Sequence, residues 1–221
     1  MPRKPISTGS TGSAKEIYLE KMTECSMRLR ASEAFLKNFQ VSGSPPEADA
    51  AILQLRKSLE AIAFASIAPH KARYEEFRSR CEDQPDFTKD YRATKILQVL
   101  SKINSHFYPT PLIPAVRQPD GSWHFDRRSE GILSKKRFVK IYDRLGRHLH
   151  STNLWSKHDG FNSLISELSD VINESFALIE THMTTIQTPE FSGVWVVKVP
   201  REGVPELITG EAEGEFCVSS K

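Results

Sequence analysis

The stretch Gly160-FNSLISELSDVINESFALIETHMTT-Ile186 decides the fold class of this 221-residue chain. Its apolar residues recur every three or four positions, which is the spacing of one face of an α-helix, and no proline interrupts it. The spacing therefore predicts one helix of about seven turns over Gly160–Ile186. Because a long helix with one apolar face needs other helices to cover that face, the stretch indicates a helical bundle.

Further helical patterns precede this stretch, separated by proline and glycine, which end helices. They cover Ala14–Gln40, a helix that begins near Pro46 and is interrupted at Pro69, then Lys71–Cys81, Asp90–Asn104 and Ser134–His150. We therefore expect a mainly α protein, built as a bundle of about five helices.

Two β-structured parts are expected beside the bundle. Short β-prone runs flank Pro119-Asp120-Gly121, a turn sequence, and predict a small β-hairpin insert near residues 113–127. A set of aromatic residues and histidines surrounds the hairpin and either anchors it to the core or stacks on nucleic-acid bases. The set consists of His106, Phe107, Tyr108, Trp123, His124 and Phe125. After Pro189 the pattern predicts a C-terminal β meander, with strands at Val194–Val199, Val204–Thr209 and Gly214–Val218.

These patterns predict a division of the chain into three parts. Residues 1–13, rich in Ser, Thr, Gly and Pro, form a flexible N-terminal segment. Residues 14–187 form the bundle with its insert, and residues 188–221 form a meander that is too small to fold alone and packs on the bundle.

Composition indicates a cytoplasmic protein without a metal or cofactor. The N-terminal segment has no apolar core, so it does not resemble a signal peptide, and the apolar run Ala61–Pro69 is too short to span a membrane. The three cysteines, Cys25, Cys81 and Cys217, lie far apart in the sequence, so neither a disulfide framework nor a zinc site is indicated.

The strongest functional signal is a concentration of positive charge before and along Ser134–His150. Eight of the 30 Lys and Arg residues lie between Arg127 and Arg147, although the whole chain has a net charge of only +2. Four of these cations have spacings of i, i+3, i+7 and i+10, which places them in one row along a helix, and Lys136 lies beside them. The row consists of Arg137, Lys140, Arg144 and Arg147. It is either an ordinary solvated face or a surface that binds an anion such as phosphate.

Two histidines, His148 and His150, follow the row at the end of the same helix. Beside a bound phosphodiester, a histidine can act as general acid or base while Arg144 stabilises the developing negative charge. Alternatively, the histidines cap the last carbonyl groups of the helix.

The segment Arg144-Leu-Gly-Arg-His-Leu-His150 resembles the motif of the HEPN superfamily, an arginine followed after four to six residues by a histidine on a helix of a bundle. Members of that family usually carry a polar residue after the arginine, whereas this chain has Leu145. The resemblance implies a homodimer in which paired motifs form a metal-independent ribonuclease site. It would make Arg144 and His150 the catalytic pair.

Two functional classes are therefore open. One is an RNA-directed protein; the resemblance implies a HEPN-like ribonuclease of a defence or toxin system, with Arg144, His148 and His150 in catalysis. Lys136, Arg137, Lys140 and Arg147 would then bind the nucleic acid. The other is a non-catalytic module that docks a protein partner on the basic helix. The sequence does not decide whether the protein is an enzyme.

Overall fold

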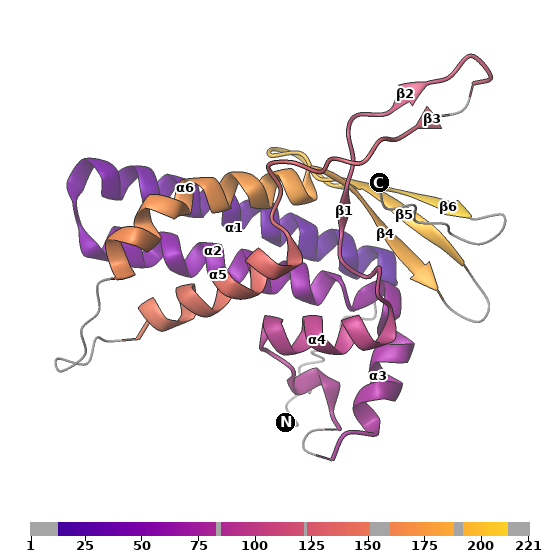
Figure 1. Cartoon of the computed structure of the whole chain (residues 1–221), viewed down its shortest axis with the longest axis horizontal. Coiled ribbons are helices and arrows are strands. Elements are labelled where there is room, and N and C mark those ends of the chain that lie inside the picture. The colour runs from indigo at the N-terminus through magenta and orange to yellow at the C-terminus, as the bar shows by residue number, and fades with distance from the viewer. Residues whose placement is uncertain (1–12, 83–84, 122, 151–159, 188–191, 212–221) are drawn as a thin grey trace, which may run out of the picture.

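The computed structural model describes residues 13–82, 85–121, 123–150, 160–187 and 192–211, and Figure 1 shows its arrangement. Two long helices, α1 (Ala14–Ser42) and α2 (Pro45–Ala65), lie side by side and form the base of the bundle. Ser13 caps α1 by accepting a hydrogen bond from the backbone N–H of Glu16, and the carboxylate of Glu16 accepts one from the backbone N–H of Ser13. Gly43, with φ of 66°, ends α1 and allows the sharp turn into α2. The predicted N-terminal segment lies outside the described residues except for Ser13.

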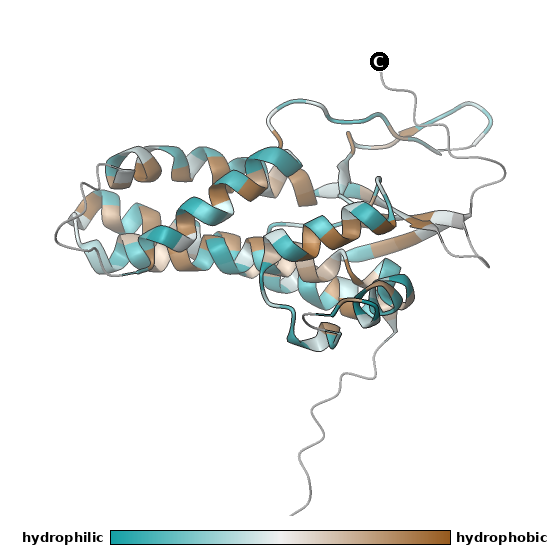
Figure 2. Cartoon of the chain, turned by 60° about the horizontal axis from the view of Figure 1, so that its bottom comes forward, coloured by the Kyte–Doolittle hydropathy of each residue, from teal (hydrophilic) through white to brown (hydrophobic). Residues whose placement is uncertain are grey.

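An apolar stripe on α2 forms the centre of the core. Its side chains are fully buried, as are small residues that let α1 approach closely. The buried stripe consists of Ile52, Leu55, Leu59 and Ile62, with Ala51, Ala63 and Ala65 beside it. Figure 2 shows the same division on every helix, with hydrophobic strips turned inward and hydrophilic strips turned outward.

Pro69 interrupts the helical path as predicted. A 3₁₀ turn, η1 (Ala68–His70), follows α2 and leads into α3 (Lys71–Ser79). After a second 3₁₀ turn, η2 (Phe87–Lys89), the chain forms α4 (Ala93–Ile103), whose buried face covers α2.

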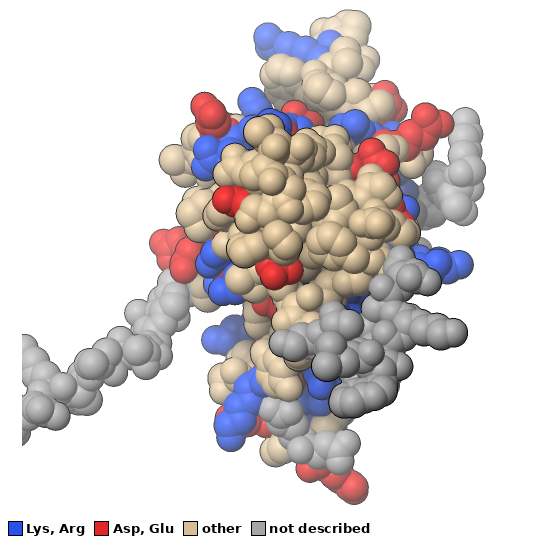
Figure 3. All heavy atoms as spheres, turned by 90° about the vertical axis from the view of Figure 1, so that its left-hand side faces the viewer, with Lys and Arg blue, Asp and Glu red and all other residues tan. Residues whose placement is uncertain are grey.

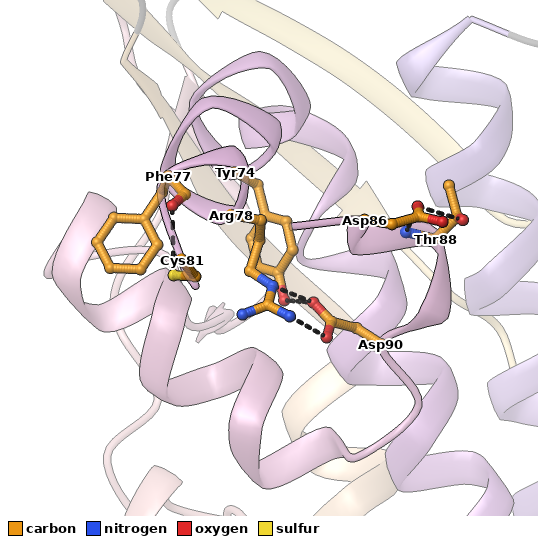
Figure 4. A network of polar contacts seen from close by, with 7 residues as sticks. All are labelled: Tyr74, Phe77, Arg78, Cys81, Asp86, Thr88 and Asp90. Carbon is orange, nitrogen blue, oxygen red and sulfur yellow. Dashed lines mark hydrogen bonds and ion pairs between the residues drawn. The ribbon is translucent and has the colours of Figure 1, made fainter. Parts of the chain in front are cut away.

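A buried ion pair fixes the start of α4 against α3 (Figure 4). Arg78 of α3 places its Nε 2.9 Å from Oδ2 of Asp90, and its Nη2 donates a 3.0 Å hydrogen bond to Oδ1. The hydroxyl of Tyr74 donates a second hydrogen bond, 2.9 Å long, to Oδ2. Both charged side chains are at most 3% exposed, so the pair is fully removed from solvent.

The last two helices are α5 (Lys135–His148) and α6 (Gly160–Ile179). The prediction that α6 continues to Ile186 is wrong, because Thr181–Gln187 forms strand β4. Residues 181–186 contain three threonines and an isoleucine, which favour strands, and their backbone pairs with a strand later in the chain. The side chains of His182, Thr184 and Ile186 alternate into the core, which is the spacing of a strand and not of a helix.

The C-terminal strands form an antiparallel sheet with the order β1-β4-β5-β6. The predicted meander is confirmed as β5 (Ser192–Lys198) and β6 (Glu206–Glu211), whereas the strand predicted at Gly214–Val218 lies outside the described residues. β4 and the short β1 (Thr110–Pro111) belong to segments that the sequence assigned to the bundle. The buried side chains of Trp195 and Val197 on β5 join the helical core.

The hairpin insert is confirmed as β2 (Val116–Arg117) and β3 (Trp123–His124), joined by a turn in which Gly121 has φ of 87°. The hairpin projects away from the helices (Figure 1). Of the aromatic residues and histidines around the hairpin, Phe107 is buried in the core and Tyr108 packs against it. Trp123 is 62% exposed and His124 is also exposed, so the prediction that the set anchors the hairpin to the core is wrong for these two.

The described cysteines are free thiols, with Cys25 buried and Cys81 half-buried. Cys217 lies outside the described residues. Within the part of the chain that the structure describes, no helix combines the length and apolar character needed to cross a membrane.

Candidate nucleic-acid interface

Helix α5 separates apolar from charged residues sharply. The side chain of Ser134 accepts a hydrogen bond from the backbone N–H of Arg137 and so caps the helix start. Four apolar or aromatic side chains at helical spacing are buried: Phe138, Ile141, Tyr142 and Leu145. This buried face holds α5 against α2, α4 and α6, and it leaves the cations of the helix on the remaining faces.

Half of the predicted basic row is used in contacts with α6. Arg137 Nε lies 2.7 Å from Glu174 Oε2, and Arg144 Nη1 donates a 2.7 Å hydrogen bond to Glu167 Oε1. Arg144 Nη2 also donates to the hydroxyl of Ser163, at 3.4 Å. Because both arginines and both glutamates are spaced by seven residues on helices that run in opposite directions, the two ion pairs form one matched contact.

The other cations of the basic region face solvent. Lys136, Lys140 and Arg147 are exposed, and within the described ranges none of the three pairs with a carboxylate. We call these three residues the α5 outer face. Asp143, the acidic residue of α5, lies on the same side of the helix, so the face has a net charge of +2.

A hollow of about 420 Å³ lies between α2, α4 and the end of α5. Three arginines line it, together with His150, and we call it the arginine hollow; the arginines are Arg56, Arg92 and Arg147. Arg56 is held firmly, because Nη1 donates to the carbonyl oxygen of Tyr142 (2.9 Å) and Nη2 to its hydroxyl (2.7 Å). The guanidinium carbon lies 3.9 Å from the centre of the Tyr142 ring, a cation–π contact.

The three residues predicted to be catalytic have different surroundings. Arg144 faces α6 and does not line the arginine hollow. His148, half-buried in the last turn of α5, has its ring 6.2 Å from that of Phe161 on α6. His150 lies just beyond α5, is exposed and lines the hollow with Arg147. The structure therefore brings His150 together with Arg147, and it places Arg144 on the side of α5 that meets α6.

Arg56 and Arg92 were not predicted as site residues from the sequence. Arg56 lies within the apolar stripe of α2, and Arg92 precedes α4, so neither is near Arg147 in the chain. Gly146 was the available signal, because a glycine inside a helix often marks a close approach. A Cβ atom added at Gly146 would collide with Nη1 of Arg56.

The charge on other surfaces is less segregated. Figure 3 views the bundle from the end where α1 turns into α2, and there Lys and Arg mix with Asp and Glu around a largely uncharged centre. Within the described residues, no group of three or more His, Cys, Asp or Glu side chains is placed to hold a metal ion.

Fold and surface together define a mainly α protein that carries a small C-terminal sheet and a basic face on α5. No protein-family model matches the chain, and no curated protein or solved structure was found to be similar to it.

The double variant Glu167→Gln, Glu174→Gln should lose stability through the matched contact between α5 and α6. Partly exposed ion pairs contribute about 0.2–1 kcal/mol each, so we expect a loss of about 1 kcal/mol in urea unfolding at low salt. High salt should reduce this loss, because it screens partly exposed charges. The matched control is Glu75→Gln, Asp170→Asn, which alters two exposed carboxylates. Equal stability of the two double variants at low salt would contradict the pairing.

Proposed function

We propose that this protein binds single-stranded RNA along the α5 outer face. The observation that carries the proposal is the presence of three exposed cations on one side of one helix, Lys136, Lys140 and Arg147, for which the described residues provide no ion-pair partner. At 1.5 Å per residue they extend over about 17 Å, and at 3.6 residues per turn they fall within about 40° of one another. A phosphate backbone can therefore contact all three at once.

Phosphate binding accounts for a charge arrangement that folding does not require. Arg137 and Arg144 already have carboxylate partners on α6, so their charge is used within the molecule. The three cations of the α5 outer face outnumber the one carboxylate among them, Asp143, so the face keeps a net charge of +2 that a polyanion can neutralise. Binding to RNA also releases counterions, which adds affinity at low salt. The resemblance of Arg144–His150 to a ribonuclease motif favours RNA over other polyanions.

The triple variant Lys136→Ala, Lys140→Ala, Arg147→Ala should bind single-stranded RNA about 100-fold more weakly at 0.1 M salt. Each phosphate contact with a single strand contributes about 0.7 to the slope of log affinity against log salt, so three contacts contribute about 2. Fluorescence anisotropy with a labelled oligonucleotide over a range of salt concentrations measures both the affinity and the slope.

A matched control removes the same charges from other parts of the surface. Lys15, Arg30 and Lys71 are exposed, and no carboxylate partner is found for them in the described residues. The variant Lys15→Ala, Arg30→Ala, Lys71→Ala should bind RNA nearly as the wild type does. Equal losses in the two triple variants would show that net charge, and not the α5 outer face, determines binding. If wild type binds no RNA at low salt, the face instead fits an acidic protein partner.

Ribonuclease action is a second candidate, favoured by the exposure of His150 beside the cations of the arginine hollow. Arg144 would have to exchange Glu167 for a substrate phosphate before it could stabilise a transition state. RNA that is cut by wild type without added metal, and not by His150→Ala, would support this activity. RNA that is bound tightly but stays intact would show that the protein binds RNA without cutting it.

A further inference from the structure

The arginine hollow contains more positive charge than its immediate contacts neutralise. Its lining includes Arg56, Arg92 and Arg147, whereas Asp143 is the one acidic residue that lines it. Glu60 lies nearby and pairs with Arg56, its Oε1 being 3.4 Å from Nε. Arg92 and Arg147 have no ion-pair partner among the described residues, and once Glu60 and Asp143 are counted against the three arginines the hollow keeps a net charge of about +1.

Arg56 is positioned before any ligand arrives. Its two hydrogen bonds to Tyr142 and its stacking on the Tyr142 ring fix the plane of the guanidinium group. Fixed guanidinium groups bind phosphate well, because two parallel N–H groups match two phosphate oxygens and little side-chain entropy is lost. The absence of a side chain at Gly146 is what leaves room for this arrangement.

The start of α4 adds to the positive potential at the hollow. Arg92 is the N-cap residue of α4, and its side chain does not cap the helix; the hydroxyl of Tyr142 instead accepts a hydrogen bond from the backbone N–H of Ala93, in the first turn. Thr94, in that turn, lines the hollow. The positive end of a helix dipole favours an anion, and here it lies beside three arginines and a fixed Arg–Tyr contact.

We infer that the arginine hollow binds a phosphate monoester, the group found at a phosphorylated end of an RNA chain. A monoester carries a charge of about −1.5 to −2 near pH 7, more than the single charge of a phosphodiester, so the three guanidinium groups of the hollow attract it more strongly than they attract a diester. The hollow adjoins the α5 outer face, with which it shares Arg147. The inference rests on the proposed RNA binding for the source of the phosphate.

The test compares three RNA oligonucleotides of one sequence, with a 5′-phosphate, with a 3′-phosphate, and with hydroxyl groups at both ends. Wild type should bind at least one phosphorylated form about tenfold more tightly than the hydroxyl form, since a hydrogen bond to a charged group is worth about 1.5–3 kcal/mol. The preferred end identifies the polarity of the bound strand. Equal affinity for all three RNAs would overturn the inference.

Arg92→Ala should abolish this preference and leave the affinity for hydroxyl-ended RNA within about twofold of wild type, because Arg92 is outside the α5 outer face. Arg30→Ala, an exposed arginine of α1, is the matched control and should retain the preference. Gly146→Ala should also lose the preference, because the added methyl displaces Arg56, whereas Gly160→Ala meets only an ordinary contact with His148. A preference that survives both Arg92→Ala and Gly146→Ala would place the phosphate elsewhere.

Inorganic phosphate alone separates this inference from the proposed function. A saturable calorimetric signal that Arg92→Ala removes, together with no RNA binding, would retain the hollow as a phosphate site and refute RNA binding. RNA binding without any preference for a phosphorylated end would support the proposed RNA binding and refute the hollow as a phosphate site.

Discussion

Asp90→Ala is expected to destabilise the protein by about 3–5 kcal/mol, because it leaves the guanidinium of Arg78 buried without a counter-charge. Asp90 accepts hydrogen bonds from Arg78 and from Tyr74, and burial together with this carboxylate raises the pKa of Tyr74. Removing the carboxylate breaks both hydrogen bonds, and no other described carboxylate is paired with Arg78 (Figure 4). Urea unfolding at pH 7.5, followed by circular dichroism, measures the loss.

Asp86→Ala is the matched control for this prediction, since Asp86 belongs to the same loop but is exposed (Figure 4). Its carboxylate caps η2 through the backbone N–H and the hydroxyl of Thr88, at 3.0 and 2.6 Å. Because this carboxylate is exposed, its removal should cost much less stability than removal of Asp90. A second variant, Arg78→Met with Asp90→Leu, should recover much of the stability, because it removes both charges together. If Asp90→Ala loses no more free energy of unfolding than Asp86→Ala, the guanidinium of Arg78 reaches solvent once its carboxylate partner is removed, which contradicts the prediction.

This ion pair also connects folding to the arginine hollow. Asp90 lies two residues before Arg92, so its contact with Arg78 of α3 fixes the point at which α4 begins. The position of α4 in turn places Arg92 and Thr94 at the hollow. The positions of α2, α4 and α5 at the hollow therefore depend on contacts in the core. A selective phosphate site requires side chains that are held rigidly in this way.

The helices could be predicted from the sequence where an apolar stripe is long and proline or glycine marks its ends. The stripe of α2, from Ile52 to Ile62, and the break at Pro69 are of this kind. Residues 181–186 could not be assigned in this way, because Ile179, Met183 and Ile186 fit a helical period. What makes this segment a strand is pairing with β5, and a local pattern does not contain that information.

The candidate site shows the same limit for charge. The spacing of Arg137, Lys140, Arg144 and Arg147 predicts that they share one side of a helix, and their positions on α5 agree with it. The glutamates that pair with two of them lie on α6, 23 and 37 residues further along the chain. Which half of the row stays unpaired therefore depends on how α5 packs against α6. The sequence of α5 alone predicts that the helix is basic, but it does not predict which cations pair with α6 and which face solvent.

Lowering the pH from 7.5 to 5 is expected to reduce the free energy of unfolding by about 4 kcal/mol, through two buried histidines. Burial lowers the pKa of His70 to about 4, with a smaller contribution from nearby Arg73, and burial also lowers the pKa of His182 to about 4. The Nδ1–H of His182 donates to the carbonyl oxygen of Ile179, and Nε2 accepts from the hydroxyl of Tyr18. Within the described residues, neither ring nitrogen of His70 has a hydrogen-bond partner.

The sign follows from which state binds protons. An unfolded histidine takes up a proton near pH 6.5, whereas both buried rings remain neutral until about pH 4. Between these values the unfolded chain binds more protons, so stability falls as the pH falls, by about 2 kcal/mol for each histidine at pH 5. Above pH 6.5 neither ring contributes to the pH dependence. Most carboxylates titrate below pH 5, so the chosen window reports mainly on histidine.

Each histidine can be tested by a variant that removes its titration. His70→Leu should halve the loss between pH 7.5 and 5 without lowering stability at pH 7.5, because a buried ring without hydrogen bonds is replaced by an apolar side chain. His182→Gln should also halve it, since an amide can still bond to Ile179 and Tyr18 without taking up a proton. The exposed His124 provides the control His124→Gln, which should leave the loss unchanged. If wild type is equally stable at pH 7.5 and pH 5, the two rings are not held neutral by burial, because burial without protonation has to appear as this dependence.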